Sequence, residues 1–166
     1  MSKEIKNLVI SAITGDKVAY GDLYEHYATD MYRFALAICK NTYDAQDAVQ
    51  ETAISVFKSI SNLKNPEKFK SYLFSSLSNT CKRMLSKNNN TDEFEDTGYT
   101  DNEIEFSIPV REALGKLDDV SKEIILLSVV AGFKSKEIGK IMDLPSATVR
   151  TKQKRALSKL REELEL

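Results

Sequence analysis

The stretch SKEIGKIMDLPSATVRTK, residues 135–152, contains two short helical patterns separated by a tight turn. Ile138 before the turn and Val149 after it lie where the two helices would bury their apolar faces. Gly139 is small enough for a close helix crossing, and Asp143 lies where such a turn needs a positive φ, which Asp tolerates less well than Gly. The pattern predicts a helix-turn-helix, whose second helix enters the major groove of DNA.

The second helix of this motif has a strongly basic exposed face. Arginine can bond guanine through two hydrogen bonds and Gln153 could do the same with adenine, while lysine and hydroxyl groups suit phosphates. A solvated basic helix surface is the alternative, but the motif in front of it favours DNA. The residues expected to contact duplex DNA are Thr148, Arg150, Thr151, Lys152, Lys154 and Arg155.

The residues before the motif continue the helical pattern and complete a small domain, residues 108–166. Ser121 is a plausible N-cap for one helix, and Gly132 would end it. Pro145 suits the first turn of the last helix, where a missing N–H costs little.

Residues 1–87 form a second block of helical patterns with no strand-like alternation. A short helix is expected near residues 3–14, ending at Gly15, and Asn65-Pro66 indicates a turn. The apolar stripes that follow are Leu23, Tyr27, Met31, Phe34 and Ile38; Ala45, Val49, Ala53, Val56 and Ile60; and Phe69, Leu73, Leu77 and Cys81.

The net charge of −1 hides an acidic segment between these two blocks. Residues 88–107 hold seven acidic residues and no basic residue, whereas each flanking block carries a net charge of +3. So polar a segment buries too little surface to offset its ordering entropy. We interpret it as a flexible linker; a long surface loop within one domain is the alternative. The expected fold class is therefore all-α, with two small helical domains.

Several function classes are disfavoured by composition. Two cysteines form no Cys-x-x-Cys pair and are expected as buried thiols, and the single histidine, His26, argues against a His-rich metal site or a Ser-His-Asp hydrolase. No apolar run approaches the ~20 residues of a membrane span, and the N-terminus has no signal-like apolar stretch. We expect a cytoplasmic protein with no cofactor, no metal, no small-molecule substrate and no membrane insertion, and not an enzyme.

Residues 132–152, with the lead-in helix at 117–127, resemble conserved region 4 of bacterial sigma factors, a motif also similar to response-regulator output domains. The first block separates the two families. Residues 44–51 (DAQDAVQE) resemble the acidic signature of sigma region 2, and residues 69–79 resemble its Phe-x-x-Trp-Leu pattern. The chain is therefore identified as resembling the sigma-70 family, of the extracytoplasmic-function (ECF, group 4) type.

This resemblance implies the partners of the chain. They are core RNA polymerase, through its β′ clamp helices and β flap, promoter DNA and an anti-sigma factor. The polymerase-binding residues implied are Asp44, Asp47, Gln50 and Glu51. By spacing, Asp44, Asp47 and Glu51 share one helical face, and Gln50 lies beside them. A solvated helix face is the plainer interpretation of that spacing, and Gln46 replaces a Glu that is common in the family.

The resemblance also places the melted downstream promoter element on the helix that starts at Phe69. The residues implied are Lys68, Tyr72, Asn79, Lys82 and Arg83, with residues 61–68 as the base-capturing loop. Tyr72, which replaces the family's Trp, could instead pack in the core, and Arg83 replaces an Asp.

Two other functions remain open. A stand-alone helix-turn-helix regulator would bind DNA without polymerase. An all-α enzyme with a DNA-binding tail would need a convergent polar pocket in residues 1–87, and the sequence shows none.

Overall fold

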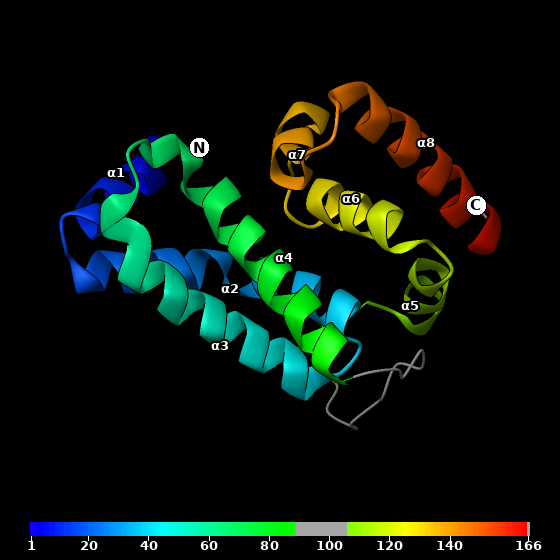
Figure 1. Ribbon diagram of the computed structural model, residues 1–166, viewed down its shortest axis with the longest axis horizontal. Coiled ribbons are helices and arrows are strands. Elements are labelled where there is room, and N and C mark those ends of the chain that lie inside the picture. Colours follow the sequence, from blue (N-terminus) through cyan, green and yellow to red (C-terminus); the bar gives the residue numbers. More distant parts are fainter. Residues whose placement is uncertain (89–105, 166) are drawn as a thin grey trace.

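The computed structural model describes residues 1–88 and 106–165, and every regular element within those ranges is helical (Figure 1). The predicted all-α class is therefore confirmed. Of the predicted acidic linker, residues 89–105 lie outside the described residues.

The first domain is a four-helix bundle built around α2. Leu23 and Met31 of α2 are fully buried, and α1, α3 and α4 all pack against this helix. Asn41 caps α3 by accepting a hydrogen bond from the Asp44 amide at 2.8 Å. The elements are α1 (Lys3–Ile13), α2 (Lys17–Cys39), α3 (Thr42–Ser59), the 3-10 turns η1 (Ile60–Asn62) and η2 (Pro66–Lys68), and α4 (Phe69–Asn88).

The second domain contains α5 (Ile108–Gly115), α6 (Asp119–Val129), α7 (Ser135–Met142) and α8 (Ser146–Glu163). The prediction that Ser121 caps α6 is wrong. Asp118 is the N-cap, and its carboxylate accepts hydrogen bonds from the Ser121 amide at 2.8 Å and the Ser121 hydroxyl at 2.9 Å. Gly132 follows α6 at a φ of +76°, as its predicted role requires, and Pro145 directly precedes α8.

The two domains pack against each other through α4 and share one apolar core (Figure 1). The second domain places α7 against α4 and α6 against α2. Phe133 meets Phe74 of α4 edge to face, with ring centroids 5.8 Å apart. The position of the second domain is thus set by contacts with the first.

The two cysteines are buried free thiols, as predicted. Cys81 of α4 lies against Cys39 at the end of α2, and this thiol contact together with burial raises the pKa of Cys81. No helix in the described ranges is long and apolar enough to cross a membrane.

Candidate nucleic-acid interface

The turn between α7 and α8 has the geometry that the sequence predicted. Asp143 adopts a φ of 55° and a ψ of 49°, and the Leu144 amide donates to the Gly139 carbonyl at 2.8 Å. A Cβ atom added to Gly139 would lie 2.6 Å from the Leu144 carbonyl oxygen. The close crossing of α7 and α8 therefore depends on glycine at this position.

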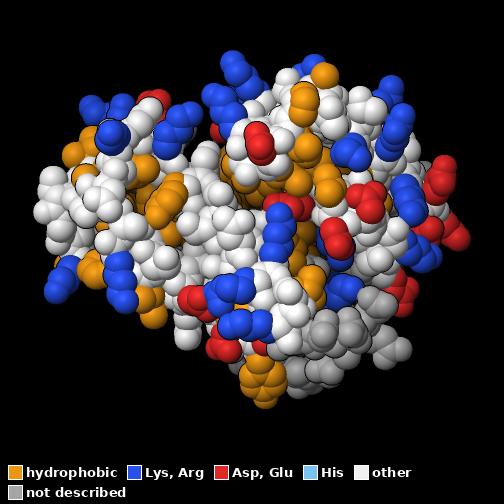
Figure 2. All heavy atoms as spheres, in the orientation of Figure 1, with side chains coloured by type: hydrophobic (Ala, Val, Ile, Leu, Met, Phe, Trp, Pro, Cys, Tyr) orange, Lys and Arg blue, Asp and Glu red, His pale blue; other side chains and the backbone are white. Residues whose placement is uncertain are grey.

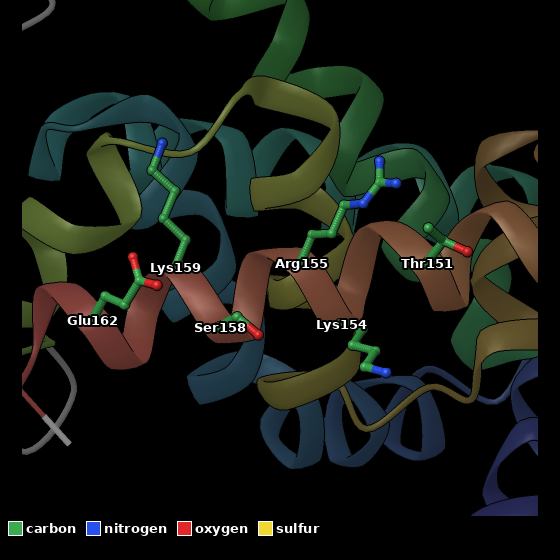
Figure 3. A pocket seen from close by; sticks show the side chains of 6 residues that line it. All are labelled: Thr151, Lys154, Arg155, Ser158, Lys159 and Glu162. Carbon is green, nitrogen blue, oxygen red and sulfur yellow. The ribbon is translucent and has the colours of Figure 1, made fainter.

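The exposed face of α8 is basic along most of its length. Arg150, Lys154 and Arg155 are exposed, and Thr151 is exposed with its hydroxyl bonded to the Ala147 carbonyl at 3.0 Å. Figure 3 shows a shallow surface hollow along this helix and the side chains that line it. In Figure 2, Lys and Arg side chains follow the edge that α8 forms, and acidic side chains gather near its C-terminal end.

Two residues of this helix are turned towards the rest of the domain. Lys152 is half-buried and its positive charge helps to lower the pKa of Asp118, although the main cause is the hydrogen bond from the Ser121 amide. Gln153 donates to the Ser128 hydroxyl at 2.8 Å and accepts a longer bond from Ser135 at 3.4 Å. Gln153 thus holds α8 against α6 and α7, and its contact with adenine stays a prediction. Thr148 is also half-buried.

The predicted polymerase-binding residues lie on the outer face of α3. Asp47, Gln50 and Glu51 are exposed and, with Ile54, line a shallow hollow between α3 and α4. Asp44 differs from the other three because it is half-buried and accepts a hydrogen bond from the Asn41 side chain at 2.8 Å. Asp47, Gln50 and Glu51 thus lie together on one surface, and Asp44 lies in the first turn of the same helix.

The predicted downstream-element residues do not all present free side chains. Arg83 forms an ion pair with Glu51, and so joins the α4 surface to the α3 surface. Tyr72 is half-buried with its hydroxyl 2.5 Å from that of Ser59, which supports the packed interpretation of this ring. Asn79 and Lys68 are exposed.

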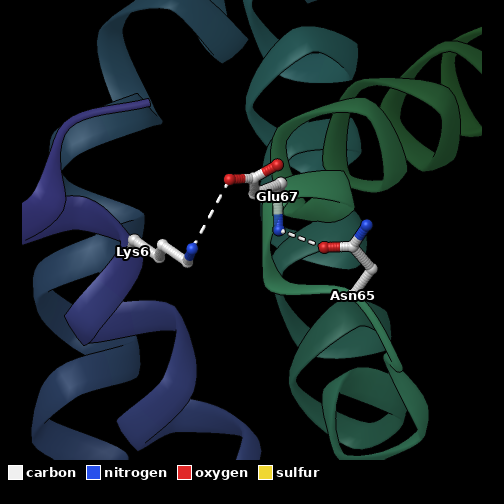
Figure 4. A network of polar contacts seen from close by, with 3 residues as sticks. All are labelled: Lys6, Asn65 and Glu67. Atoms are coloured by element: carbon white, nitrogen blue, oxygen red, sulfur yellow. Dashed lines mark hydrogen bonds and ion pairs between the residues drawn. The ribbon is translucent and has the colours of Figure 1, made fainter.

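The predicted base-capturing loop, residues 61–68, is anchored at its C-terminal part. Asn65 accepts a hydrogen bond from the Glu67 amide at 3.0 Å, and the Glu67 carboxylate lies 3.5 Å from Lys6 of α1 (Figure 4). Leu63 is half-buried and packs on the core. The loop is therefore fixed to α1 at one side, while Asn62 and Lys64 remain exposed.

Comparison with known proteins identifies both domains. Residues 23–91 match Sigma-70 region 2, and residues 107–160 match Sigma-70 region 4. RNA polymerase sigma factor SigV of Bacillus subtilis is 31% identical over 166 residues, which cover 96% of this chain and 92% of SigV. The chain belongs to the sigma-70 family, in its ECF group. ECF sigma factor SigW of the same organism is 24% identical over 99% of this chain and 98% of SigW.

Two solved structures share this fold. CnrH, in complex with the cytosolic domain of CnrY, superimposes with a TM-score of 0.79 at 23% identity, over 98% of each chain. The sigma factor RpoE of Bartonella quintana, in complex with the anti-sigma factor NepR, superimposes with a TM-score of 0.70 at 19% identity, over 87% of this chain and 98% of that one. As a sigma factor, the chain directs RNA polymerase to specific promoters and so initiates transcription.

Sequence reasoning missed the polar contacts between the domains. Glu123 of α6 reaches Ser78 and Lys82 of α4, and Lys70 donates to the Ala131 carbonyl. The only available signal was the position of a charged residue, Glu123, directly before the apolar run 124–127. Within residues 1–88 and 106–165, no three His, Cys, Asp or Glu side chains cluster as metal ligands.

Proposed function

We propose that the two domains recognise different elements of the promoter. Residues 1–87 bind core RNA polymerase and the melted downstream element, and residues 108–166 bind the upstream element as a duplex. The acidic α3 face docks on the β′ clamp helices through Asp44, Asp47, Gln50 and Glu51. The basic α8 face enters the major groove, with Arg150 placed to reach base edges and Lys154 and Arg155 placed to hold phosphates.

The observation that carries this proposal is the separation of two oppositely charged helix faces. The helices α3 and α8, which carry the acidic and the basic residues, lie at opposite sides of the molecule with α4, α6 and α7 between them (Figure 1). One chain can therefore hold a polymerase and a DNA duplex at the same time, which a stand-alone regulator does not need.

The downstream element is assigned to α4 and the loop before it. Asn79, Lys82 and Arg83 of α4 offer amide and cationic groups, and Lys68 of η2 adds a further cation directly before this helix, which suits an unpaired strand. Tyr72 packs against Ser59 of α3 and so holds α4 in place. The chain itself performs no catalysis, and the polymerase supplies the chemistry.

An anti-sigma factor is the third proposed partner, because both structural neighbours were captured with CnrY or NepR on a related fold. It would cover α3 or α8 and so prevent polymerase or promoter binding. We place the protein in the cytoplasm, where RNA polymerase acts.

Core binding by substituted chains tests the α3 assignment. Asp47→Asn combined with Gln50→Ala should weaken co-migration with core polymerase on size-exclusion chromatography, because it removes one negative charge and one amide group from the docking face. Asp22→Asn is the control, since Asp22 is also an exposed helix carboxylate, on α2. Equal binding by both variants would show that α3 is only a solvated face and would favour the stand-alone regulator.

A further inference from the structure

The contact between the two domains runs along a single stripe of α4. Lys70, Phe74, Ser78 and Lys82 follow one another every four residues, so they share one helix face. Each of them touches the second domain. Lys70 donates to the Ala131 carbonyl and lies 4.9 Å from the centroid of the Phe133 ring, and Phe74 packs on the same ring.

The C-terminal half of this stripe holds a buried carboxylate from α6. Glu123 Oε1 accepts a hydrogen bond from the Ser78 hydroxyl at 2.5 Å, and Oε2 lies 2.8 Å from the Lys82 ammonium. The Glu123 side chain is only 6% exposed, whereas that of Lys82 is 54% exposed. The carboxylate therefore comes from the second domain, but the hydroxyl and the ammonium that bind it belong to the first.

A hydroxyl and an ammonium on one helix face form the donor pair that commonly holds a nucleic-acid phosphate. A carboxylate, like a phosphate, presents negatively charged oxygens to such donors and forms charge-assisted hydrogen bonds with them. The exposed Arg83 and Lys87 continue the positive charge of α4 beyond Lys82.

We infer that Ser78 and Lys82 form a phosphate site for the single-stranded promoter backbone, and that Glu123 occupies this site while the domains are packed together. The inference rests on the proposed role of α4 in holding the melted strand. It adds Ser78 to that surface and makes Glu123 an internal competitor of DNA. Strand binding then requires the second domain to leave α4, which withdraws Glu123, exposes the Ser78 hydroxyl and releases the Lys82 ammonium from its ion pair.

Strand affinity of the full chain tests this inference by fluorescence anisotropy with a short fluorescein-labelled single strand of mixed sequence. Glu123→Gln keeps a hydrogen-bond acceptor for Ser78 but releases Lys82. We expect affinity to rise by about tenfold, the scale of one charge-assisted contact. The plot of log K against log salt should steepen by about 0.7, as for one added phosphate contact on a single strand.

Glu163→Gln is the matched control. It changes the net charge equally and releases Lys116, which is 58% exposed, from an ion pair of 2.5 Å within the second domain. The double variant E123Q/K82Q should lose the gain that E123Q produces. Equal gains in E123Q and E163Q, or a gain that persists in E123Q/K82Q, would overturn the inference.

A fold control and a transcription assay complete the design. Far-UV circular dichroism checks the helicity of each variant. If E123Q loses helicity, it is replaced by Glu123→Asp, which shortens the side chain without changing its charge. A smaller gain in strand affinity is then expected, and no gain contradicts the inference. Initiation is assayed on the same preparations. If the wild-type chain initiates transcription but E123Q and E163Q bind the single strand with equal affinity, the phosphate site is wrong and the proposed function stands. If E123Q binds the strand more tightly through Lys82 but the chain never initiates transcription, the proposed function is wrong and the phosphate site stands.

Discussion

Substitution of Gly139 by alanine should damage the DNA-reading domain while leaving the first domain intact. The added Cβ would lie 2.6 Å from the Leu144 carbonyl oxygen, whereas ordinary contacts begin at 3.4 Å. The turn must therefore retreat by about 0.8 Å. It is held in place by the left-handed Asp143 and by the bond from the Leu144 amide to the Gly139 carbonyl.

The expected cost follows from two opposing terms. Overpacking against a well-packed neighbour costs about 1–3 kcal/mol, and a backbone atom that is fixed on both sides belongs at the upper end of that range. Replacing glycine by alanine inside a helix stabilises the helix by about 1 kcal/mol, because alanine has the higher helix propensity. The net loss in the free energy of unfolding should be about 1–2 kcal/mol, together with weaker binding of duplex DNA because α8 shifts relative to α7.

Urea unfolding followed by two signals separates the domains. All seven tyrosines precede residue 108, so near-UV circular dichroism follows the first part of the chain, whereas far-UV circular dichroism follows both domains. Gly115→Ala is the control, because a Cβ there meets nothing within 4 Å. If G139A unfolds at the same urea concentration as G115A and binds duplex DNA as tightly as the wild type, the close crossing of α7 and α8 does not depend on glycine at this position.

Three further substitutions follow from the second domain. Asp118→Ala should lower the free energy of unfolding by about 0.5–2 kcal/mol, because it removes an N-cap. The hydrogen bond from the Ser121 amide lowers the pKa of Asp118, so this stabilisation is complete above pH 3.8 and is lost at lower pH. The urea midpoints of the wild type and of Asp118→Ala should therefore converge in acid. Burial, helped by Lys40, lowers the pKa of Lys122, so the unfolded chain binds more protons between that lowered pKa and 10.5. The contribution of Lys122 to stability should therefore increase with pH over that interval, so the stability of the wild type relative to Lys122→Met should rise in alkaline urea titrations. Arg150→Ala should cost about 1–3 kcal/mol on the preferred duplex and less on a scrambled one, measured by anisotropy, whereas an equal loss on both would make Arg150 a phosphate contact.

The helix-turn-helix was predictable because its determinants are local. Gly139 is required by the close approach of the Leu144 carbonyl, and Asp143 adopts the positive φ of the turn. Both constraints come from residues within the motif itself. The cap of α6 was mispredicted because Asp118 and Ser121 are both good N-cap residues within one turn, and the sequence pattern does not decide between them.

The side-chain partners across elements were not predictable from the sequence. Gln153 looks exposed beside the basic residues of α8, yet Ser128 and Ser135 engage it. Glu123 accepts a hydrogen bond from Ser78, which lies 45 residues away in the sequence, and no local pattern encodes that pairing. The same applies to Arg83, whose ion pair with Glu51 depends on how α3 packs on α4.

Run-off transcription tests the central claim most directly. The purified chain is added to core RNA polymerase on a library of genomic fragments, and transcript starts are mapped. We expect discrete starts, absent with core alone, that share two spaced sequence elements, and we expect these starts to be lost when the exposed face of α8 is neutralised. Failure to direct initiation, together with failure to bind core polymerase, would contradict it.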